Sequence, residues 1–480
     1  MTIVPRLSRS PNTEITNGIV HLGVGAFFRA HGAMYISESM EHTSRSWGVV
    51  GVSLRRPDQR DKLQPQQFAY TTVEQSDGPA KIQNIDVITD VLVAPENPKD
   101  VINALANSGI HLVTMTITEK GYCRSSGNSG LDFTHEDIAH DLANLDRPIS
   151  AIGFLVAALA QRKADGLRPF TILSCDNLPE NGKITRQLVI EFAAKIDGEL
   201  ATWIEEECCF PCSMVDRIVP ATTAEDIARV EKQIGFYDAS PVVHEPFRQW
   251  VIEDSFVDNK RPPFEKVGVQ LVDDVLPFET MKLRCLNGTH SALAYLGYLA
   301  GHETISCAVS DAPIRAFTNH LWGDEIIPAI EAPCGVDLDK YCASLMERYE
   351  NTAIQHKTWQ IAMDGSHKLP QRILATIENN LRNDLPVDGL CLTVAAWMKY
   401  TSGTDLQGTN IDVRDPLSSS FKHIADNHTK GAEIVDAYLN LNTVFSTELS
   451  KNTTFRSNVE SKYMALIDNG VASAINGVLA

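Results

Sequence analysis

Three polar side chains interrupt an otherwise apolar segment of the chain: Lys282, Asn287 and His290. A lysine whose pKa lies near neutral can give and take a proton, and a carboxamide or imidazole can hydrogen-bond an oxygen whose charge changes. Buried polar side chains cost free energy unless they are hydrogen-bonded. The structural alternative is that Lys282 reaches solvent and that Asn287 and His290 are satisfied within the core.

These residues must be positioned by a helix, which the apolar spacing predicts over residues 280–299. With 3.6 residues per turn, Asn287 and His290 share one face, and Lys282 lies roughly 80° away around the axis. Thr280 is the predicted N-cap. Lys282 would then lie in the first turn, where the helix dipole disfavours a cation, so we expect its pKa to be lowered.

A strand and a glycine turn near the N-terminus predict a nucleotide-binding unit. Residues 18–25 read GIVHLGVG, and a helix is expected over residues 26–40. Gly23 and Gly25 supply the first glycines of a G-x-G-x-x-G turn, but Phe28 stands where the third would be. Alone, this pattern is a weak indication of dinucleotide binding.

The choice between NAD and NADP stays open in the sequence. Residues 47–54 predict the second parallel strand, and Asp58 is the nearest acid that could bind the ribose. It lies farther from the glycine turn than the usual spacing of about 20 residues. Arg55 and Arg56 precede it and could instead bind the 2′-phosphate of NADP.

Two later strands also end in polar loops. Residues 111–118 run into TITEKGY, which contains Thr118 and Glu119, and residues 170–174 run into SCDNLPENG, which contains Asn177. Ligands of open α/β sheets bind at the carboxyl ends of strands. We therefore expect Thr118 and Glu119 beside the cofactor, whereas Asn177 could be a ligand contact or only a turn former.

The chain of 480 residues is too long for one ordinary core. Strands dominate up to residue 275 and helices dominate beyond it. We predict an α/β, Rossmann-type dinucleotide-binding domain at residues 1–275 and a mainly α-helical domain at residues 276–480. The remaining predicted strands are residues 68–73, 82–93 and 246–254.

A loop in the helical half, residues 364–372, reads DGSHKLPQR. Ser366 could cap the following helix and would place Lys368 in its first turn. A bound anion would offset the unfavourable position of this cation. The alternative is a solvated surface loop.

Composition excludes several classes of function. The net charge of −19 argues against non-specific binding to nucleic acid or to anionic membranes. The chain has no apolar run long enough to span a membrane and no secretory h-region, so we expect a cytoplasmic protein. Cys209 and Cys212 have metal-ligand or redox spacing, but no second pair accompanies them, so no metal is expected.

Five motifs occur in order along the chain: HLGVGAFFRAH, TITEKGY, SCDNLPENG, MVDRIVPATT and MKLRCLNGTHSALAYLGYLAG. Together they resemble the polyol-specific long-chain dehydrogenase/reductase family, also called the mannitol dehydrogenase family. The resemblance covers nearly the whole chain. It implies a Rossmann-type domain, a mainly helical second domain, an active site between them, and metal-independent hydride transfer between a nicotinamide cofactor and a secondary alcohol or ketose.

The resemblance also implies roles for single residues. Lys282 resembles the general acid/base, and Asn177 and Asn287 resemble the amides that hold the substrate oxygen. His290 resembles a contact to a substrate hydroxyl, and Asp216 part of the same polar network.

The family's own glycine turn accounts for the missing third glycine. Gly23, Gly25, Phe27 and Arg29 match it. The expected cofactor is NAD, with NADP not excluded.

One segment bears on the substrate. Gln360 stands where mannitol dehydrogenases carry an arginine, which is similar to the branch that reduces D-fructuronate to D-mannonate. A uronate carboxylate would bind Lys368 and Arg372. The alternatives are an uncharged polyol or ketose, as in mannitol 2-dehydrogenase or arabinitol dehydrogenase, or a nucleotide sensor without catalysis. A monomer or a small homo-oligomer is expected, and the physiological direction stays open.

Overall fold

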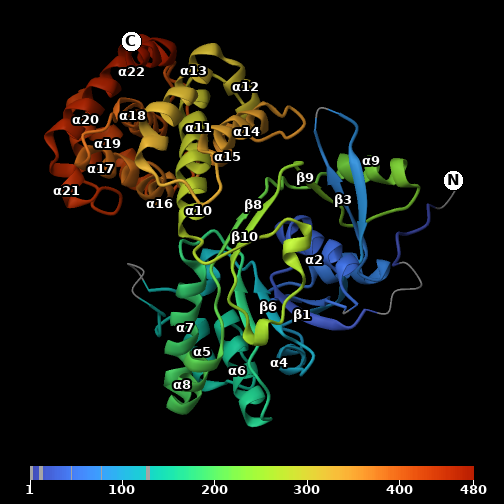
Figure 1. Cartoon of the computed structure of the whole chain (residues 1–480). Helices are drawn as coiled ribbons and strands as arrows, with labels where there is room; N and C mark the ends of the chain where they lie inside the picture. Colours follow the sequence, from blue (N-terminus) through green and yellow to red (C-terminus); the bar gives the residue numbers. More distant parts are fainter. Residues whose placement is uncertain (1–3, 10–14, 45, 77, 126–129) are drawn as a thin grey trace. The chain divides into compact units, whose positions relative to one another are not determined.

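A computed structural model describes residues 4–9, 15–44, 46–76, 78–125 and 130–480. The chain forms two compact units, Met1–Leu276 and Pro277–Ala480 (Figure 1). Each unit has its own core and is described by itself. Within the described residues, no helix is both long and apolar enough to cross a membrane.

The first unit is built on a five-stranded parallel sheet with strand order β5-β2-β1-β6-β7. Its strands are β1 (Asn17–Leu22), β2 (Gly48–Ser53), β5 (Ile88–Val93), β6 (Leu112–Met115) and β7 (Thr171–Ser174). The strand order reverses between β1 and β6. Such a switch point is where open α/β sheets bind ligands.

Alternate residues of β1 enter two different cores, so both faces of the sheet are covered. Val20 packs in the core around α6, whereas Ile19 packs in the core around Trp250. The helices of this unit are α1 (Ala26–Ala30), α2 (Gly32–Ser39), α3 (Asp58–Leu63), α4 (Pro98–Ala106), α5 (Glu136–Ala143), α6 (Ala151–Ala164), α7 (Asn181–Ile196), α8 (Gly198–Glu207) and α9 (Ala224–Ile234). Short 3-10 helices are η1 (Met40–His42), η2 (Gln64–Gln66), η3 (Glu119–Tyr122), η4 (Val257–Asn259) and η5 (Phe264–Val267).

Two smaller sheets complete the first unit. One has the order β11-β10-β8, from β8 (Ser213–Asp216), β10 (Gln249–Glu253) and β11 (Gln270–Val272). The other has the order β4-β3-β9, from β3 (Tyr70–Glu74), β4 (Lys81–Ile85) and β9 (Val242–His244). Helix α9 packs on this second sheet through Val230.

Two predicted elements are divided in the structure. The single strand expected over residues 82–93 is two strands: β4 pairs with β3 in a small sheet, and β5 pairs with β2 in the large sheet. The helix expected over residues 26–40 breaks at His31, whose φ of −130° and ψ of −84° are not helical. The His31 imidazole compensates by a 2.9 Å hydrogen bond to the carbonyl of Gln249.

The described part of the second unit is helical. Its α-helices are α10 (Leu276–Met281, which begins one residue before the unit), α11 (Thr289–Leu299), α12 (Ile305–Ser310), α13 (Ala312–His320), α14 (Leu338–Glu350), α15 (Thr358–Ala362), α16 (Gly365–Leu369), α17 (Ala375–Arg382), α18 (Asp388–Thr401), α19 (Ser418–Asn427), α20 (Gly431–Leu439), α21 (Thr447–Lys451) and α22 (Thr453–Leu479). Three π-helices, η6 (Lys282–Gly288), η7 (Leu321–Ile326) and η9 (Pro370–Leu374), and the 3-10 helix η8 (Ile327–Ala329) lie among them.

Helices α11 and α18 form the centre of this unit. Both are buried along nearly their whole length, which explains why their sequences are apolar all around. The predicted fold class, a Rossmann-type parallel sheet followed by a mainly helical domain, is confirmed.

Candidate functional site

The turn after β1 approaches β6 so closely that only glycine fits. Gly23 has a φ of +98°, and a Cβ there would lie 2.1 Å from the carbonyl oxygen of Thr116. Thr116 also donates its hydroxyl to the carbonyl of Gly23 at 2.7 Å. The turn is therefore fixed against the end of the neighbouring strand, at the switch point of the sheet.

The buried side chain of His21 stabilises this turn through hydrogen bonds. Its Nδ1 lies 2.8 Å from the Thr114 hydroxyl, and its Nε2 lies 2.9 Å from the Gly23 carbonyl oxygen. The ring stacks on Phe28 with centroids 3.4 Å apart. Burial lowers the pKa of His21 to about 3, so the ring is neutral near pH 7. Sequence reasoning missed this residue, although a histidine within an apolar strand was the available signal.

Gly25 differs from Gly23. Its φ of −82° suits any residue, and the nearest atom to a Cβ placed there is 4.0 Å away. No contact within the described protein requires glycine at this exposed position, at the start of α1. The space left by the missing side chain fits a pyrophosphate that approaches the backbone, as the glycine turn of a dinucleotide site requires.

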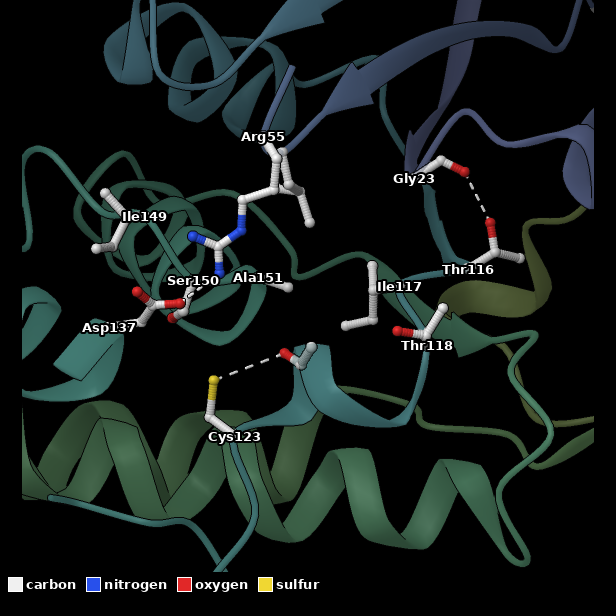
Figure 2. A pocket seen from close by; sticks show the side chains of 12 residues that line it. Gly23, Arg55, Thr116, Ile117, Thr118, Cys123, Asp137, Ile149, Ser150 and Ala151 are labelled. Atoms are coloured by element: carbon white, nitrogen blue, oxygen red, sulfur yellow. Dashed lines mark hydrogen bonds and ion pairs between the residues drawn. The ribbon is translucent and has the colours of Figure 1, made fainter. Parts of the chain in front are cut away.

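A pocket of about 250 Å³ opens at the ends of β1, β2 and β6 (Figure 2). Its apolar walls include Leu54, Ile117 and Ile149, and its polar rim includes Arg55 and Thr118. The complete lining is Gly23, Leu54, Arg55, Thr116, Ile117, Thr118, Gly121, Cys123, Asp137, Ile149, Ser150 and Ala151. Apolar walls with a polar rim are suited to a heteroaromatic ring that carries a sugar.

The Thr118 loop is held in a strained shape by Asp176. Thr118 has a φ of +64° and a ψ of 162°, a region that residues other than glycine rarely adopt. The Asp176 carboxylate accepts the N–H groups of Ile117 at 3.0 Å and Thr118 at 2.9 Å, and the Tyr122 hydroxyl at 2.8 Å. Burial raises the pKa of Asp176. This residue, which sequence reasoning did not select, adjoins the predicted Asn177.

Asn177 itself is exposed at the end of β7. The loop that carries it is anchored by Asn181, whose side chain donates to the carbonyls of Asp176 at 3.0 Å and Ser213 at 2.8 Å. Asp216, at the end of β8, is buried. Both predicted residues thus lie at carboxyl ends of strands of the first unit.

The predicted cofactor residues separate into two groups. Gly23 and Thr118 line the pocket, whereas Gly25, Phe27, Arg29, Asp58 and Glu119 do not. Asp58 and Glu119 are exposed in the first turns of α3 and η3.

The contacts of Arg29 and Phe27 are structural. The Arg29 guanidinium is buried and donates to the carbonyl of Ser240 at 2.6 Å, with the Tyr70 ring 5.3 Å away. Phe27 stacks on His31 with centroids 5.0 Å apart. Arg29 therefore joins α1 to the rest of the unit rather than facing the pocket.

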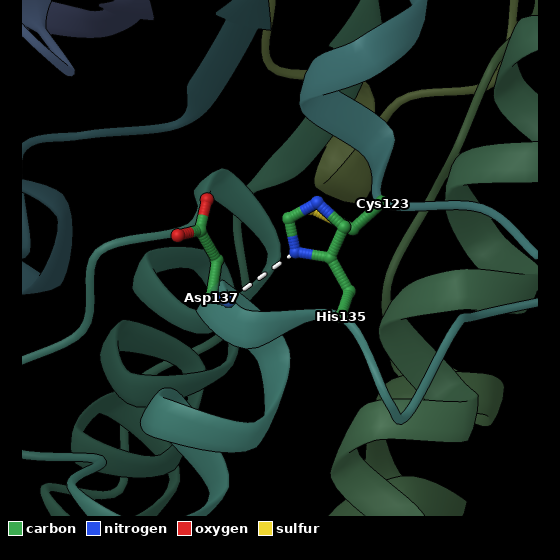
Figure 3. Close-up of side chains that lie close together, drawn as sticks. All are labelled: Cys123, His135 and Asp137. Carbon is green, nitrogen blue, oxygen red and sulfur yellow. Dashed lines mark hydrogen bonds between the residues drawn. The ribbon is translucent and has the colours of Figure 1, made fainter.

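Cys123, His135 and Asp137 bring ligand atoms within 4.8 Å of one another beside the pocket (Figure 3). All three groups already have protein partners: the Cys123 thiol donates to the carbonyl of Gly121 at 3.9 Å. The Asp137 carboxylate pairs with Arg55 at 2.5 Å, and His135 Nδ1 accepts the N–H of Asp137 at 3.2 Å. In the described residues, the Cys209 and Cys212 pair forms no such group.

The segment around Lys282 differs from the predicted α-helix. Helix α10 already begins at Leu276, so Thr280 lies inside it and the prediction of Thr280 as N-cap was wrong. Lys282 is buried and begins the π-helix η6, beyond the first turn. The predicted angles between Lys282, Asn287 and His290 therefore do not apply. π-helical turns are rare and frequent at functional sites.

Side chains stabilise this wider turn by donating to its carbonyls. Trp322 donates to the carbonyl of Cys285 at 2.9 Å, and Tyr349 donates to that of Leu286 at 3.0 Å. Thr289 donates to the Cys285 carbonyl at 2.6 Å. Trp322 and Tyr349 are distant from this turn in the sequence, which is why the local pattern predicted an ordinary helix.

His290 is buried, and its Nε2 has no hydrogen-bond partner among the described residues. Its ring lies 4.7 Å from that of His356 and 5.1 Å from that of Tyr349. Burial, and then His356 and nearby cations, hold the pKa of His290 well below its usual value. A neutral imidazole with an unsatisfied nitrogen can bind a hydroxyl.

The cations near His290 are Arg348, Lys368 and Arg372. Arg372 Nη1 donates to the Ser291 hydroxyl at 3.3 Å. Gly288 allows the backbone of Arg372 to pack close to η6, because a Cβ at Gly288 would lie 3.0 Å from the Arg372 carbonyl oxygen.

The Lys368 segment differs from the predicted helix start. Helix α16 begins at Gly365 after the N-cap Asp364, and Lys368 lies in its last turn, so the predicted Ser366 cap and the predicted first-turn position of Lys368 were both wrong. The Ser366 hydroxyl donates to Asp415 at 2.6 Å. The Lys368 ammonium donates to the carbonyls of Met363 at 2.5 Å and Ile361 at 3.3 Å. These carbonyls stabilise the Lys368 ammonium, so the structure gives less reason to expect a bound anion there than the sequence did.

Comparison with known families covers both units. The Mannitol dehydrogenase Rossmann domain matches residues 17–266, and the Mannitol dehydrogenase C-terminal domain matches residues 274–467. The chain belongs to the mannitol dehydrogenase family. It is accordingly an oxidoreductase of the class that acts on secondary alcohols, polyols and sugar acids.

Individual relatives of the family resemble nearly the whole chain. D-mannonate oxidoreductase of Escherichia coli (strain K12) is 44% identical over 97% of this chain and 96% of its own length. Mannitol 2-dehydrogenase of Aspergillus terreus is 39% identical over 98% of this chain and 94% of its own. The Pseudomonas fluorescens mannitol 2-dehydrogenase ternary complex with NAD and D-mannitol matches with a TM-score of 0.87 and 36% identity, covering 99% of this chain and 97% of that one.

Proposed function

We propose that the chain reduces D-fructuronate to D-mannonate reversibly, with NAD(H) as the cofactor. The observation that carries this proposal is the environment of His290. Its Nε2 is buried and unpartnered among the described residues, and three cations, Arg372, Arg348 and Lys368, are among the groups that lower its pKa most. Cations gathered around a buried polar group favour an anionic ligand.

A sugar acid fits this environment better than a neutral polyol. Its carboxylate would bind Lys368 or Arg372 through charge-assisted hydrogen bonds, while a hydroxyl would meet the Nε2 of His290. The 44% identity to a D-mannonate oxidoreductase supports the same substrate. Gln360, which replaces the arginine expected in mannitol dehydrogenases, also supports it.

The residues of this chain would divide the chemistry among them. When bound, NADH supplies the hydride. Lys282 gives a proton to the ketone oxygen and takes it back in the oxidation direction. Asn177 and Asn287 donate hydrogen bonds to the oxygen as its negative charge grows, and Asp216 belongs to the same polar network. No metal is needed for these steps.

The cofactor assignment rests on two features of the first unit that suit a dinucleotide. The glycine turn at Gly23 and Gly25 lies at the switch point of the sheet, and the adjacent pocket has the walls that an adenine requires. The solved relative from Pseudomonas fluorescens contains NAD. We propose that the first unit, with Thr118 at the pocket, binds NAD and that the second unit carries the proton donor.

An uncharged ketose is the second candidate. Mannitol 2-dehydrogenases are similar to this chain at 36–39% identity. The carbonyl partners of Lys368 also weaken the need for an anion at that residue. A polyol dehydrogenase would use the same Lys282 chemistry.

The two candidates differ in their dependence on Arg372. Replacing Arg372 with Ala should raise the KM for D-fructuronate by about tenfold or more and change the KM for D-fructose much less, because only the uronate loses a charged partner. Increasing ionic strength should likewise raise only the uronate KM. Equal effects of the variant and of salt on both substrates would reject the uronate and favour the polyol.

A further inference from the structure

Arg55 and Asp137 form an ion pair at the rim of the pocket in the first unit. The guanidinium Nη2 lies 2.5 Å from the Asp137 carboxylate, and both residues belong to the pocket lining. The Arg55 side chain is 66% exposed, whereas that of Asp137 is only 7% exposed. The carboxylate is thus buried, and the solvent-exposed partner is the arginine, which Figure 2 shows extended along the pocket.

The position of Arg55 indicates which part of a bound dinucleotide the Arg55–Asp137 ion pair would contact. Arg55 follows β2 by two residues, and in Rossmann-type folds the end of the second strand binds the adenosine ribose. Leu54, Ile117 and Ile149 supply the apolar walls for an adenine beside it. An arginine at this place is the residue that meets the 2′-phosphate of NADP.

We propose that Asp137 makes the chain prefer NAD to NADP, because it neutralises the arginine that would otherwise bind the 2′-phosphate. This inference rests on the proposed nicotinamide cofactor but not on the proposed sugar substrate. Asp137 is a specificity-determining residue that acts through Arg55. It comes from α5, far along the chain from the acid that follows the second strand in other NAD sites.

Charge is the physical basis of the preference. With the pair intact, the local charge is close to zero, so the ribose hydroxyls of NAD are accepted and a phosphate gains little attraction. The nearby titratable groups do not change this balance: Cys123 is a thiol whose pKa burial raises to about 11, and His135 caps α5 through its Nδ1. The neighbouring Arg56 does not line the pocket.

A purely structural role for Asp137 would predict a different effect of its replacement. Acidic residues are favourable in the first turn of a helix, and Asp137 is the second residue of α5. If that were its whole role, its loss would change stability and leave the ratio of NAD to NADP affinity unchanged.

The test is binding of each dinucleotide to the full chain without sugar, measured by calorimetry. Wild type should bind NAD⁺ more tightly than NADP⁺. Asp137→Asn, which keeps the shape of the side chain, should tighten NADP⁺ at least about tenfold relative to NAD⁺. The double variant Arg55→Ala/Asp137→Asn should lose that gain, because the gain requires the guanidinium.

A matched control is Asp254→Asn, which removes a carboxylate that pairs with Arg261 at 3.0 Å outside the pocket lining. It should leave the NAD⁺ to NADP⁺ ratio unchanged. If Asp137→Asn does not fold, Arg55→Ala alone decides the question: it leaves the Asp137 carboxylate facing the 2′-phosphate, so NADP⁺ should weaken by about threefold or more while NAD⁺ changes less.

Several results would overturn the inference: an unchanged ratio in Asp137→Asn, a gain that survives loss of Arg55, or wild type that prefers NADP⁺. Failure to bind either dinucleotide would overturn it together with the cofactor assignment. Failure to reduce D-fructuronate, with the predicted binding ratios intact, would overturn only the proposed substrate.

Discussion

The carbonyl oxygen of Thr116 occupies the place where a side chain on Gly23 would be. A Cβ at Gly23 would lie 2.1 Å from that oxygen, and the φ of Gly23 is +98°. This contact joins the end of β1 to the end of β6, at the switch point on which the proposed cofactor site depends.

Gly23→Ala should therefore lower the free energy of unfolding by at least about 2 kcal/mol, because the strand ends must separate and the backbone is strained. The measurement is chemical denaturation followed by circular dichroism. Gly25→Ala is the matched control: with open space around its Cβ, it should unfold like wild type but bind NADH at least about tenfold more weakly. Equal stability of Gly23→Ala and wild type would contradict the described turn.

His21 should make the first unit sensitive to acid. Its pKa is about 3 in the folded chain against 6.5 in a model compound, so the unfolded chain takes up the proton first. The contribution of His21 to the free energy of unfolding is fully present above about pH 6.5. It falls as the pH drops toward 3, with a slope of at most about 1.4 kcal/mol per pH unit.

His21→Gln removes this titration. The variant should be less stable than wild type at pH 7, and its free energy of unfolding should depend less on pH between 4 and 6. Denaturant titrations at fixed pH values measure both effects. An identical pH slope in variant and wild type would mean that His21 is not buried as a neutral ring. Other histidines with lowered pKa, such as His31, contribute to the slope in both proteins.

Lys282→Ala should reduce kcat for ketone reduction by about 10² to 10⁴, the usual contribution of general acid catalysis. NADH binding should be unchanged, and small primary amines should restore part of the rate. Lys340→Ala is the charge-matched control, since Lys340 is exposed on α14 and pairs with Asp337. A Lys282→Ala variant with more than half of the wild-type turnover would assign the proton transfer to another group.

The large-scale organisation was predictable because strand and helix periods and glycine positions are local. The parallel sheet, the glycine turn at Gly23 and the helical second unit all follow from such patterns. The features that were missed depend on partners distant in sequence. The π-helix at Lys282 is stabilised by Trp322 and Tyr349, and nothing in its own residues distinguishes it from an α-helix.

The candidate site shows the same division. Gly23 and Thr118 were found because loops after parallel strands meet at one edge of a sheet. Asp137 was not found from the sequence, because its proposed role depends on its ion pair with Arg55, which lies 82 residues earlier in the chain. Arg29 matched the family motif, yet the structure shows it buried against Ser240, a contact that no motif reveals.

The most direct test of the proposed function is the ratio of kcat/KM for D-fructuronate to that for D-fructose, measured by NADH oxidation with the wild-type chain. The cations around His290 predict a ratio of about 100 or more, as expected for a site that loses a charged partner with the neutral sugar. Faster oxidation of NADH with D-fructose than with D-fructuronate would contradict the proposal and identify a polyol dehydrogenase.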